Sequence, residues 1–196
     1  MIKRIFDVTV AVFGLILFAP VFIVIAILIR LDSPGPVLFR SKRVGQHGKM
    51  FHILKFRSMV HDAPQKGPVI TCQDDPRITR TGRFLRKTKL DELPSLVNVL
   101  QGEMSVVGPR PESPAWVERY TPQQRVVLTA KPGITGLAQI KYRNEEALLS
   151  GASLEAVYPK IMNDKLNIDL GYLENRSFFL DLRILLQTAT ALFRRA

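Results

Sequence analysis

The sequence predicts an α+β fold that is mainly helical, with a small β-hairpin and an N-terminal helix embedded in a membrane. Residues 8–29 form an apolar run that is interrupted only by Thr9, Gly14 and Pro20. Two short strand-like segments flank a Gly-Gln-His-Gly turn at residues 45–48, and helical periodicity dominates the rest. A length of 196 residues suits one domain of ordinary size with a buried core.

The apolar run is long enough to cross a bilayer, which takes about 20 residues. Lys3 and Arg4 precede it and Arg30 follows it, so the positive-inside tendency draws both ends toward the cytoplasm. Pro20 removes a helix hydrogen bond and bends the axis, and the arm before it spans only roughly 22 Å. We therefore predict a Pro-kinked re-entrant helix over residues 1–33. A straight span is the alternative, since spanning helices tolerate proline, whereas no cleavage site for a signal peptide follows the run.

The body, residues 34–196, begins after a rigid Ser-Pro-Gly-Pro break. We predict strands at residues 37–43 and 50–59, a loop at 61–77, and helices at 78–87 and from 91 to a stop at Gly102. After these we predict an amphipathic helix at 113–129, turn and loop at 131–136, and an apolar helix at 178–195. Trp116 and Tyr120 suit either a membrane–water boundary or half-buried packing. The last helix either packs on the core or lies in the headgroup layer, so we expect interfacial amphipathic helices in this cytoplasmic part.

The chain is strongly basic, with a net charge of +11, of which residues 1–33 contribute +1. Such a body attracts nucleic acid, anionic lipid or phosphorylated substrates, although excess charge also favours solubility. Among these partners, the apolar N-terminal segment favours anionic lipid or a phosphorylated substrate over nucleic acid. No nucleic-acid partner is expected, because the basic residues flank one carboxylate-bearing helix start. Cys72, the single cysteine, excludes an internal disulfide, and the three histidines lack the spacing of zinc ligands.

The densest candidate site surrounds Asp91 and Glu92. Pro94 is comfortable only in a first helical turn, so the helix should begin near Asp91, with Asp91 or Thr88 as its N-cap. A plain capping role would explain both residues. A helix N-terminus also favours a phosphate and an ionised carboxylate, and an ionised Asp91 can attack phosphorus if cations neutralise the phosphate oxygens. Neighbouring helical residues point about 100° apart, so Glu92 can have a separate role.

Several cations accompany this pair. Arg110 lies between two prolines, which fix the direction of a guanidinium suited to bidentate phosphate binding. Lys55, Arg57, Arg86 and Lys89 are further candidates; a solvated surface would explain any one of them, but their number favours an anion site.

Two carboxylates, Asp169 and Asp181, lie in otherwise apolar stretches. Each is more often a surface carboxylate, yet a divalent ion bound to phosphates needs only one or two carboxylates from the protein.

Ordered motifs now become recognisable. They are Lys-Phe-Arg-Ser-Met at residues 55–59, Asp-Pro-Arg-Ile-Thr-Arg at 75–80, Leu-Asp-Glu-Leu-Pro at 90–94, Asn-Val-Leu-Gln-Gly-Glu-Met-Ser at 98–105, Gly-Pro-Arg-Pro at 108–111 and Lys-Pro-Gly-Ile-Thr-Gly at 131–136. In this order they closely resemble the bacterial sugar transferase family, the small monotopic polyprenyl-phosphate phosphoglycosyl transferases. The resemblance covers nearly the whole chain.

The resemblance implies a re-entrant membrane helix broken at a proline and ping-pong chemistry on a UDP-sugar with Mg²⁺. Asp91 would attack the sugar-proximal phosphate, release UMP and contact the metal, and Glu92 would be the partner acid. Arg86 and Arg110 match phosphate-binding positions, and Lys55 and Asp169 match other functional ones. The acceptor would be undecaprenyl phosphate, on the cytoplasmic face of the bacterial inner membrane, in the first membrane step of surface glycan or glycoconjugate assembly.

The chain departs from the family pattern at Leu137, where tryptophan is usual, and at residues 141–143 before Asn144, which bears on sugar or nucleotide preference. Glu103 replaces the usual aspartate conservatively. The alternatives to an enzyme are a membrane-anchored nucleic-acid-binding protein and an inactive membrane adaptor; the intact Asp91, Glu92 and Arg110 disfavour the adaptor. The sequence leaves open whether the chain forms a homo-oligomer.

Overall fold

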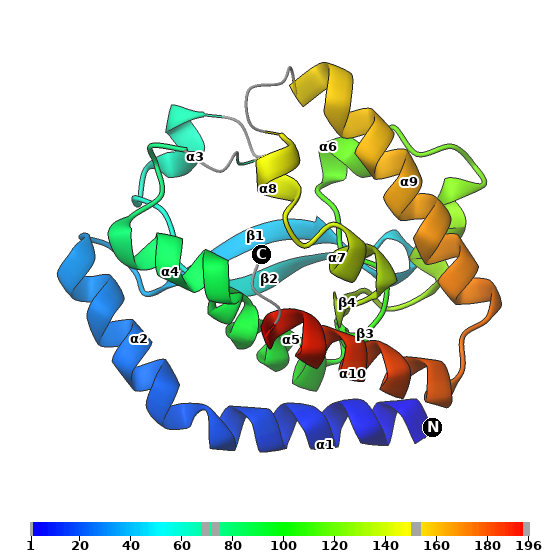
Figure 1. Ribbon diagram of the computed structural model, residues 1–196, viewed down its shortest axis with the longest axis horizontal. Helices are drawn as coiled ribbons and strands as arrows, with labels where there is room; N and C mark the ends of the chain where they lie inside the picture. The colour runs from blue at the N-terminus through cyan, green and yellow to red at the C-terminus, as the bar shows by residue number, and fades with distance from the viewer. Residues whose placement is uncertain (1, 68–70, 72–74, 150–153, 194–196) are drawn as a thin grey trace.

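The computed structural model describes residues 2–67, 71, 75–149 and 154–193. Helices surround two small sheets, and the N-terminal helices run along the edge of the body (Figure 1). The predicted class, mainly helical with a small antiparallel hairpin, is confirmed.

The N-terminal segment consists of α1 (Ile2–Leu17) and α2 (Ala19–Asp32), which meet at an angle of 61°. Pro20 lies in the first turn of α2, where its missing N–H leaves no hydrogen bond unmade. Within the described residues no single helix is long and apolar enough to cross a membrane, whereas this bent pair together meets the length and composition required. Ile16 and Leu31 are among its exposed apolar side chains, at 70% and 80% of their full exposure. The predicted kink is therefore present.

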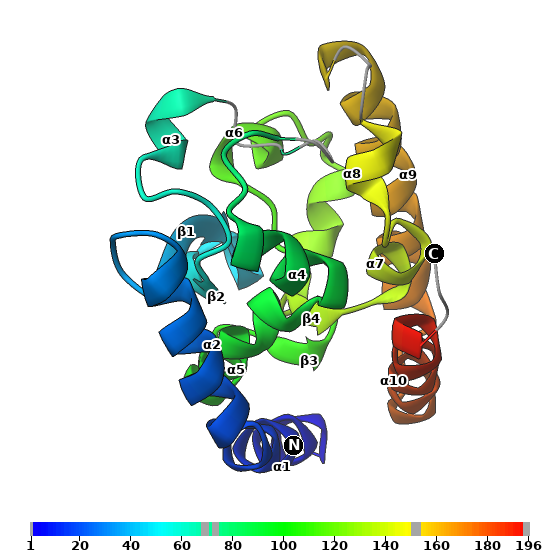
Figure 2. The same cartoon turned by 60° about the vertical axis from the view of Figure 1, so that its left-hand side comes forward.

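Helix α1 also belongs to the core of the body. Ala11 is fully buried in a cluster that includes Leu96 and Val99, and Leu96 packs against Gly14. Figure 2 shows α1 beneath α5 and the strand pair β3–β4. The predicted division of the chain after residue 33 stays a prediction.

Polar contacts fix α1 to the body as well. The Lys3 ammonium donates to the Asp181 carboxylate at 2.5 Å, and the Tyr172 hydroxyl donates to the same carboxylate at 2.6 Å. Asp7, which is buried, accepts from the Ser105 hydroxyl and from the backbone N–H of Val106 in β3. Arg4 donates to two carbonyls at the end of α5, groups that a helix leaves without intrahelical partners.

The predicted hairpin is confirmed: β1 (Leu38–Val44) pairs antiparallel with β2 (Met50–Phe56), and Leu38 lies opposite Phe56. His47 adopts a positive φ of 56° in the short 3-10 helix η1 (Gln46–Gly48) that forms the turn. Phe51 and Ile53 face the core.

A second sheet was not predicted. Strands β3 (Ser105–Val107) and β4 (Gly133–Thr135) pair in parallel, so the turn-and-loop prediction for residues 131–136 was wrong at residues 133–135. Three-residue strands are too short to show alternation in the sequence. The backbones of these two segments approach so closely that a Cβ on Gly133 would lie 2.1 Å from the Gly108 nitrogen. This close approach explains why glycine occupies position 133.

The remaining elements are α3 (Ala63–Lys66), α4 (Arg80–Thr88), the 3-10 helix η2 (Leu90–Ser95), α5 (Leu96–Gln101), α6 (Pro114–Val117), the 3-10 helix η3 (Gln124–Thr129), α7 (Leu137–Lys141), α8 (Glu145–Leu148), α9 (Leu154–Glu174) and α10 (Phe178–Phe193). The helix predicted at 113–129 is broken into α6 and η3, with Pro122 between them. Gly102 ends α5 with a φ of 82°, as predicted.

Residues 61–77, two aromatic side chains and α9 bear on the remaining sequence predictions. The loop expected at 61–77 contains α3, and Cys72 lies outside the described residues. Tyr120 is buried and Trp116 packs on the Tyr158 ring with centroids 4.5 Å apart, which supports the packing interpretation of these aromatics. The 21-residue helix α9 was missed.

Candidate functional site

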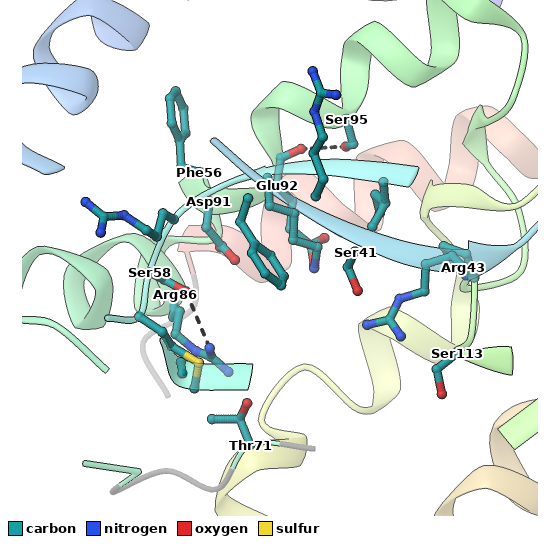
Figure 3. A pocket seen from close by; sticks show the side chains of 18 of the residues that line it. Ser41, Arg43, Phe56, Ser58, Thr71, Arg86, Asp91, Glu92, Ser95 and Ser113 are labelled. Carbon is teal, nitrogen blue, oxygen red and sulfur yellow. Dashed lines mark hydrogen bonds and ion pairs between the residues drawn. The ribbon is translucent and has the colours of Figure 1, made fainter. Parts of the chain in front are cut away.

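A pocket of about 970 Å³ lies between the hairpin, α4 with η2, the segment after β3, and α8. Its lining among the described residues includes nine Lys or Arg and five Asp or Glu, so the pocket is basic. Figure 3 shows Asp91 and Arg86 toward one side of it, and Arg43 and Ser113 toward the other. Such a cavity is large enough for a substrate of nucleotide size.

Asp91 and Glu92 are carried by η2, the tight turn between α4 and α5. Lys89, with a φ of 59°, reverses the chain after α4, and Pro94 fits the 3-10 turn. The prediction that Asp91 or Thr88 caps a helix was wrong. Asp91 lies inside η2, and the Thr88 hydroxyl donates back to the carbonyls of Phe84 and Leu85. The site therefore depends on side-chain charges rather than on a capped helix N-terminus.

The Asp91 carboxylate is the least satisfied acid of the pocket. It is 8% exposed, and its Oδ1 atom has no hydrogen-bond partner among the described residues. Burial raises the pKa of Asp91 above its ordinary value, although the charges of Lys55, Arg86 and Lys89 oppose the rise. An acid that is buried, unpaired and surrounded by cations is suited to react with, or to bind, a phosphate and its counterion.

Glu92 instead forms the fixed centre of a charge cluster. Its Oε1 accepts from Lys55 at 2.6 Å and from Arg110 at 3.0 Å. Burial disfavours its ionisation, but the charges of Arg110 and Lys55 outweigh burial and hold the pKa of Glu92 well below its ordinary range. In return, the Glu92 charge raises the pKa of Arg110. Glu92 thus stays ionised and orients two cations beside Asp91.

Arg86 projects from α4 into the pocket. Its Nη2 and Nε atoms donate to Glu146 of α8 at 2.6 and 3.2 Å, and its Nη1 donates to the Ser58 hydroxyl at 3.4 Å. The guanidinium is thereby oriented from two sides, as a phosphate-binding fork requires.

Two predicted site residues lie apart from this cluster. Arg57 touches the pocket wall, but its guanidinium donates to the carbonyls of Ser33 and Pro34 and so fixes the end of α2 to β2. Asp169, on α9, lies behind the pocket lining and accepts from the Arg110 backbone N–H. Burial raises the pKa of Asp169 to about 7. The structure therefore gathers Lys55, Arg86 and Arg110 around Asp91 and Glu92, with Asp169 supporting the Arg110 loop.

Sequence reasoning missed the acidic side of the pocket. Glu145 and Glu146 of α8 line the pocket, and so does Glu112. Arg43 and Ser113, also missed, lie toward the side away from Asp91 (Figure 3). No local pattern points to Glu146, because it pairs with a residue 60 positions away.

The carboxylates of the pocket are the candidate ligands for a divalent cation. The described part of the chain contains no group of three or more His, Cys, Asp and Glu side chains able to hold a metal. Mg²⁺ commonly uses only one or two protein carboxylates and takes its other ligands from water and substrate phosphates. Asp91, whose buried Oδ1 has no partner among the residues that the structure describes, fits that pattern.

Comparison with known proteins agrees with this geometry. The chain is 40% identical over 187 residues to an uncharacterised sugar transferase, EpsL, of Bacillus subtilis, covering 95% of this chain and 85% of the relative. It is 40% identical to the UDP-glucose:undecaprenyl-phosphate glucose-1-phosphate transferase of Caulobacter vibrioides, covering 97% and 69%. An N-acetylgalactosaminephosphotransferase of Aeromonas hydrophila, which uses undecaprenyl phosphate by name, is 38% identical, covering 95% of this chain but only 42% of that longer protein. The family profile described as bacterial sugar transferase matches residues 1–195, and the chain belongs to this family.

Proposed function

We propose that the protein transfers a sugar-1-phosphate from a UDP-sugar to undecaprenyl phosphate, giving a polyprenyl-diphospho-sugar and UMP. The observation that carries the proposal is the buried Asp91 carboxylate, whose Oδ1 has no partner among the described residues, in a basic pocket. Relatives named for this reaction use glucose or N-acetylgalactosamine. The similarity therefore supports the reaction, whereas the identity of the sugar depends on the residues that line the pocket.

In the first half-reaction, an oxygen of Asp91 attacks the phosphorus that carries the sugar. A new phosphorus–oxygen bond to Asp91 forms, the bridging bond of the diphosphate breaks, and its electron pair leaves with UMP. Lys55, Arg86 and Arg110 neutralise the phosphate oxygens, which lowers the repulsion between two anions. Burial raises the pKa of Asp91, and the neighbouring cations oppose that rise and so favour the ionised carboxylate that attacks.

In the second half-reaction, a phosphate oxygen of the acceptor lipid attacks the same phosphorus, and the bond to Asp91 breaks with its electrons returning to the carboxylate. Glu92 keeps Lys55 and Arg110 in place throughout. When bound, Mg²⁺ supplies charge neutralisation on the diphosphate, with Asp91 as its protein ligand. We expect EDTA to abolish UMP release and added Mg²⁺ to restore it.

The membrane arrangement is also a proposal. Exposed apolar side chains on α1 and α2, together with the 61° bend, support a helix pair that enters and leaves the cytoplasmic face of the inner membrane. Exposed Phe179 and Leu186 support an interfacial position for α10. In a Cys72→Ser background, cysteines at Ile2 and Lys49 should both react with an impermeant reagent in inside-out vesicles; reaction of only one would refute the same-face arrangement.

The reaction itself is tested with Asp91→Asn. Protein in lipid nanodiscs is mixed with a UDP-sugar labelled at the sugar-proximal phosphate, with and without undecaprenyl phosphate. Wild type should release UMP and carry label without acceptor, and Asp91→Asn should lose both, by at least about 1,000-fold in rate. Asp164→Asn is the matched control, because Asp164 pairs with Lys141 on the surface outside the pocket. Full activity of Asp91→Asn would refute the proposed nucleophile, and absence of UMP release from wild type with every donor would refute the reaction.

A further inference from the structure

Helix α8 is held over the pocket by two ion pairs that diverge from neighbouring residues. Glu145 accepts from the buried Lys165 of α9 at 2.5 Å, and Glu146 accepts from Arg86 of α4 at 2.6 Å. Both glutamates and the buried Leu149 line the pocket. The pairs fix α8 between α9 and α4, so the Glu146 carboxylate has a defined position at Arg86.

The position of Arg86 determines which part of a substrate Glu146 meets. Arg86 is one of the cations whose charge acts on Asp91, the group that attacks phosphorus in the proposed function. In the proposed reaction Arg86 would therefore face the phosphate under attack, which is the phosphate that bears the sugar. The sugar is joined to that phosphate through a single oxygen, so the carboxylate bound to Arg86 would meet the sugar.

A carboxylate in that position has two chemical consequences. It accepts hydrogen bonds from hydroxyl or amide N–H groups, and bonds to a charged acceptor are stronger than neutral ones. It also repels a second carboxylate held nearby in a partly desolvated pocket. Leu149, which is buried and follows α8 directly, adds an apolar side chain to the pocket lining near Glu146.

We propose that Glu146 determines donor specificity: it selects neutral sugars that present a hydroxyl or amide donor near the anomeric carbon, and it rejects uronic acids. This inference rests on the proposed function and names the class of sugar that the same site accepts.

The test measures UMP release by the full chain in nanodiscs from UDP-glucose, UDP-N-acetylglucosamine and UDP-glucuronate. Glu146→Gln should lower kcat/KM for the better neutral donor by roughly 10-fold or more, the effect of weakening a hydrogen bond to a charged group. It should also raise the ratio of glucuronate to neutral-sugar activity by at least about 10-fold, because the repulsion is removed. Glu146→Asp keeps the charge, so it should lower neutral-sugar activity yet leave that ratio near the wild-type value. Glu118→Gln, an exposed glutamate outside the pocket, is the control and should change neither quantity.

The outcomes distinguish failure of the specificity role of Glu146 from failure of the proposed function. An unchanged ratio in active Glu146→Gln protein overturns the inference and leaves the proposed function standing. An equal loss with all donors, together with weaker inhibition by free UMP, would assign Glu146 to the nucleotide and also overturn it. If Glu146→Gln fails to fold, as judged by its thermal unfolding, the Glu146→Asp ratio decides: a rise in that ratio overturns the inference. Failure of wild type to release UMP from any donor refutes the proposed function and this inference with it.

Discussion

Gly82 lies in the first turn of α4, where the helix passes directly over the backbone at the end of β2. A Cβ added at Gly82 would lie 1.9 Å from the carbonyl oxygen of Ser58, and the two other nearest atoms are also Ser58 backbone atoms. The same oxygen accepts from the Thr79 N–H at 3.1 Å, which joins the start of α4 to this strand. Gly82→Ala therefore meets backbone rather than a flexible side chain.

The size of the effect follows from that distance. To reach 3.0 Å, below which real Cβ contacts essentially never occur, α4 must move by at least 1.1 Å from Ser58. We expect a loss of about 3 kcal/mol in the free energy of unfolding, the upper part of the range for overpacking. For a chain of this size that corresponds to a fall of about 6–12 °C in Tm. Arg86 lies one turn further along α4, so its guanidinium is displaced from Asp91, and a shift near 1 Å is expected to lower kcat/KM by about 100-fold.

Gly171→Ala provides a control with the same chemical change. Gly171 lies in α9 and has no heavy atom within 4 Å of the added Cβ, so alanine should gain about 0.5–1 kcal/mol from helix propensity. Thermal unfolding and UMP-release kinetics are measured for both variants. Equal midpoints and equal activities for Gly82→Ala and Gly171→Ala would refute the close-approach argument.

Three other predictions address residues around the site. Burial favours protonated Asp169 in the folded state, so the stability gained from that proton is complete below pH about 3.8 and is lost as pH rises to about 7. Across this window the free energy of unfolding of wild type should thus fall by up to about 4 kcal/mol relative to that of Asp169→Asn, as measured by unfolding at several pH values. A difference between the two proteins that does not change with pH would contradict the prediction. Arg57→Lys cannot fork to the Ser33 and Pro34 carbonyls, so unfolding should show a loss of about 1–3 kcal/mol while KM for the UDP-sugar stays within about twofold; a large rise in KM would instead assign Arg57 to substrate. Leu85 is fully buried where α4 faces α2 and β2, so Leu85→Ala should lower the free energy of unfolding by about 2–5 kcal/mol. A decrease of less than about 1 kcal/mol would show that the surrounding side chains close around the smaller residue.

Local physics explains what the sequence could predict. The hairpin depends on neighbouring residues and a glycine-flanked turn, and the end of α5 depends on one glycine with a positive φ, so both were recognisable. The kink depends on Pro20 in the same way. The cationic cluster was recognisable as a set of residue types, and the structure brings Lys55, Arg86 and Arg110 together.

The rest depends on contacts between distant parts of the chain. Lys55 meets Glu92 across 37 positions and Arg86 meets Glu146 across 60, and no periodic pattern encodes such pairs. Arg57 lines the pocket, but its guanidinium donates to backbone carbonyls at the end of α2, and its role in substrate binding stays a prediction. The capping interpretation of Asp91 failed because a reversal at Lys89 and a 3-10 turn replaced the regular helix that Pro94 suggested.

The polar contacts of α1 have a consequence for how the chain is made. Asp7 meets Ser105 across 98 positions and Lys3 meets Asp181 across 178. During translation α1 therefore emerges before its partners: Asp7 stays unpaired until residue 105 has left the ribosome, and Lys3 until residue 181 has. A fragment that starts after α2 would lack Ala11 from its core and leave Asp181 without its lysine. The polar contacts of α1 are thus complete only when α10 packs against it.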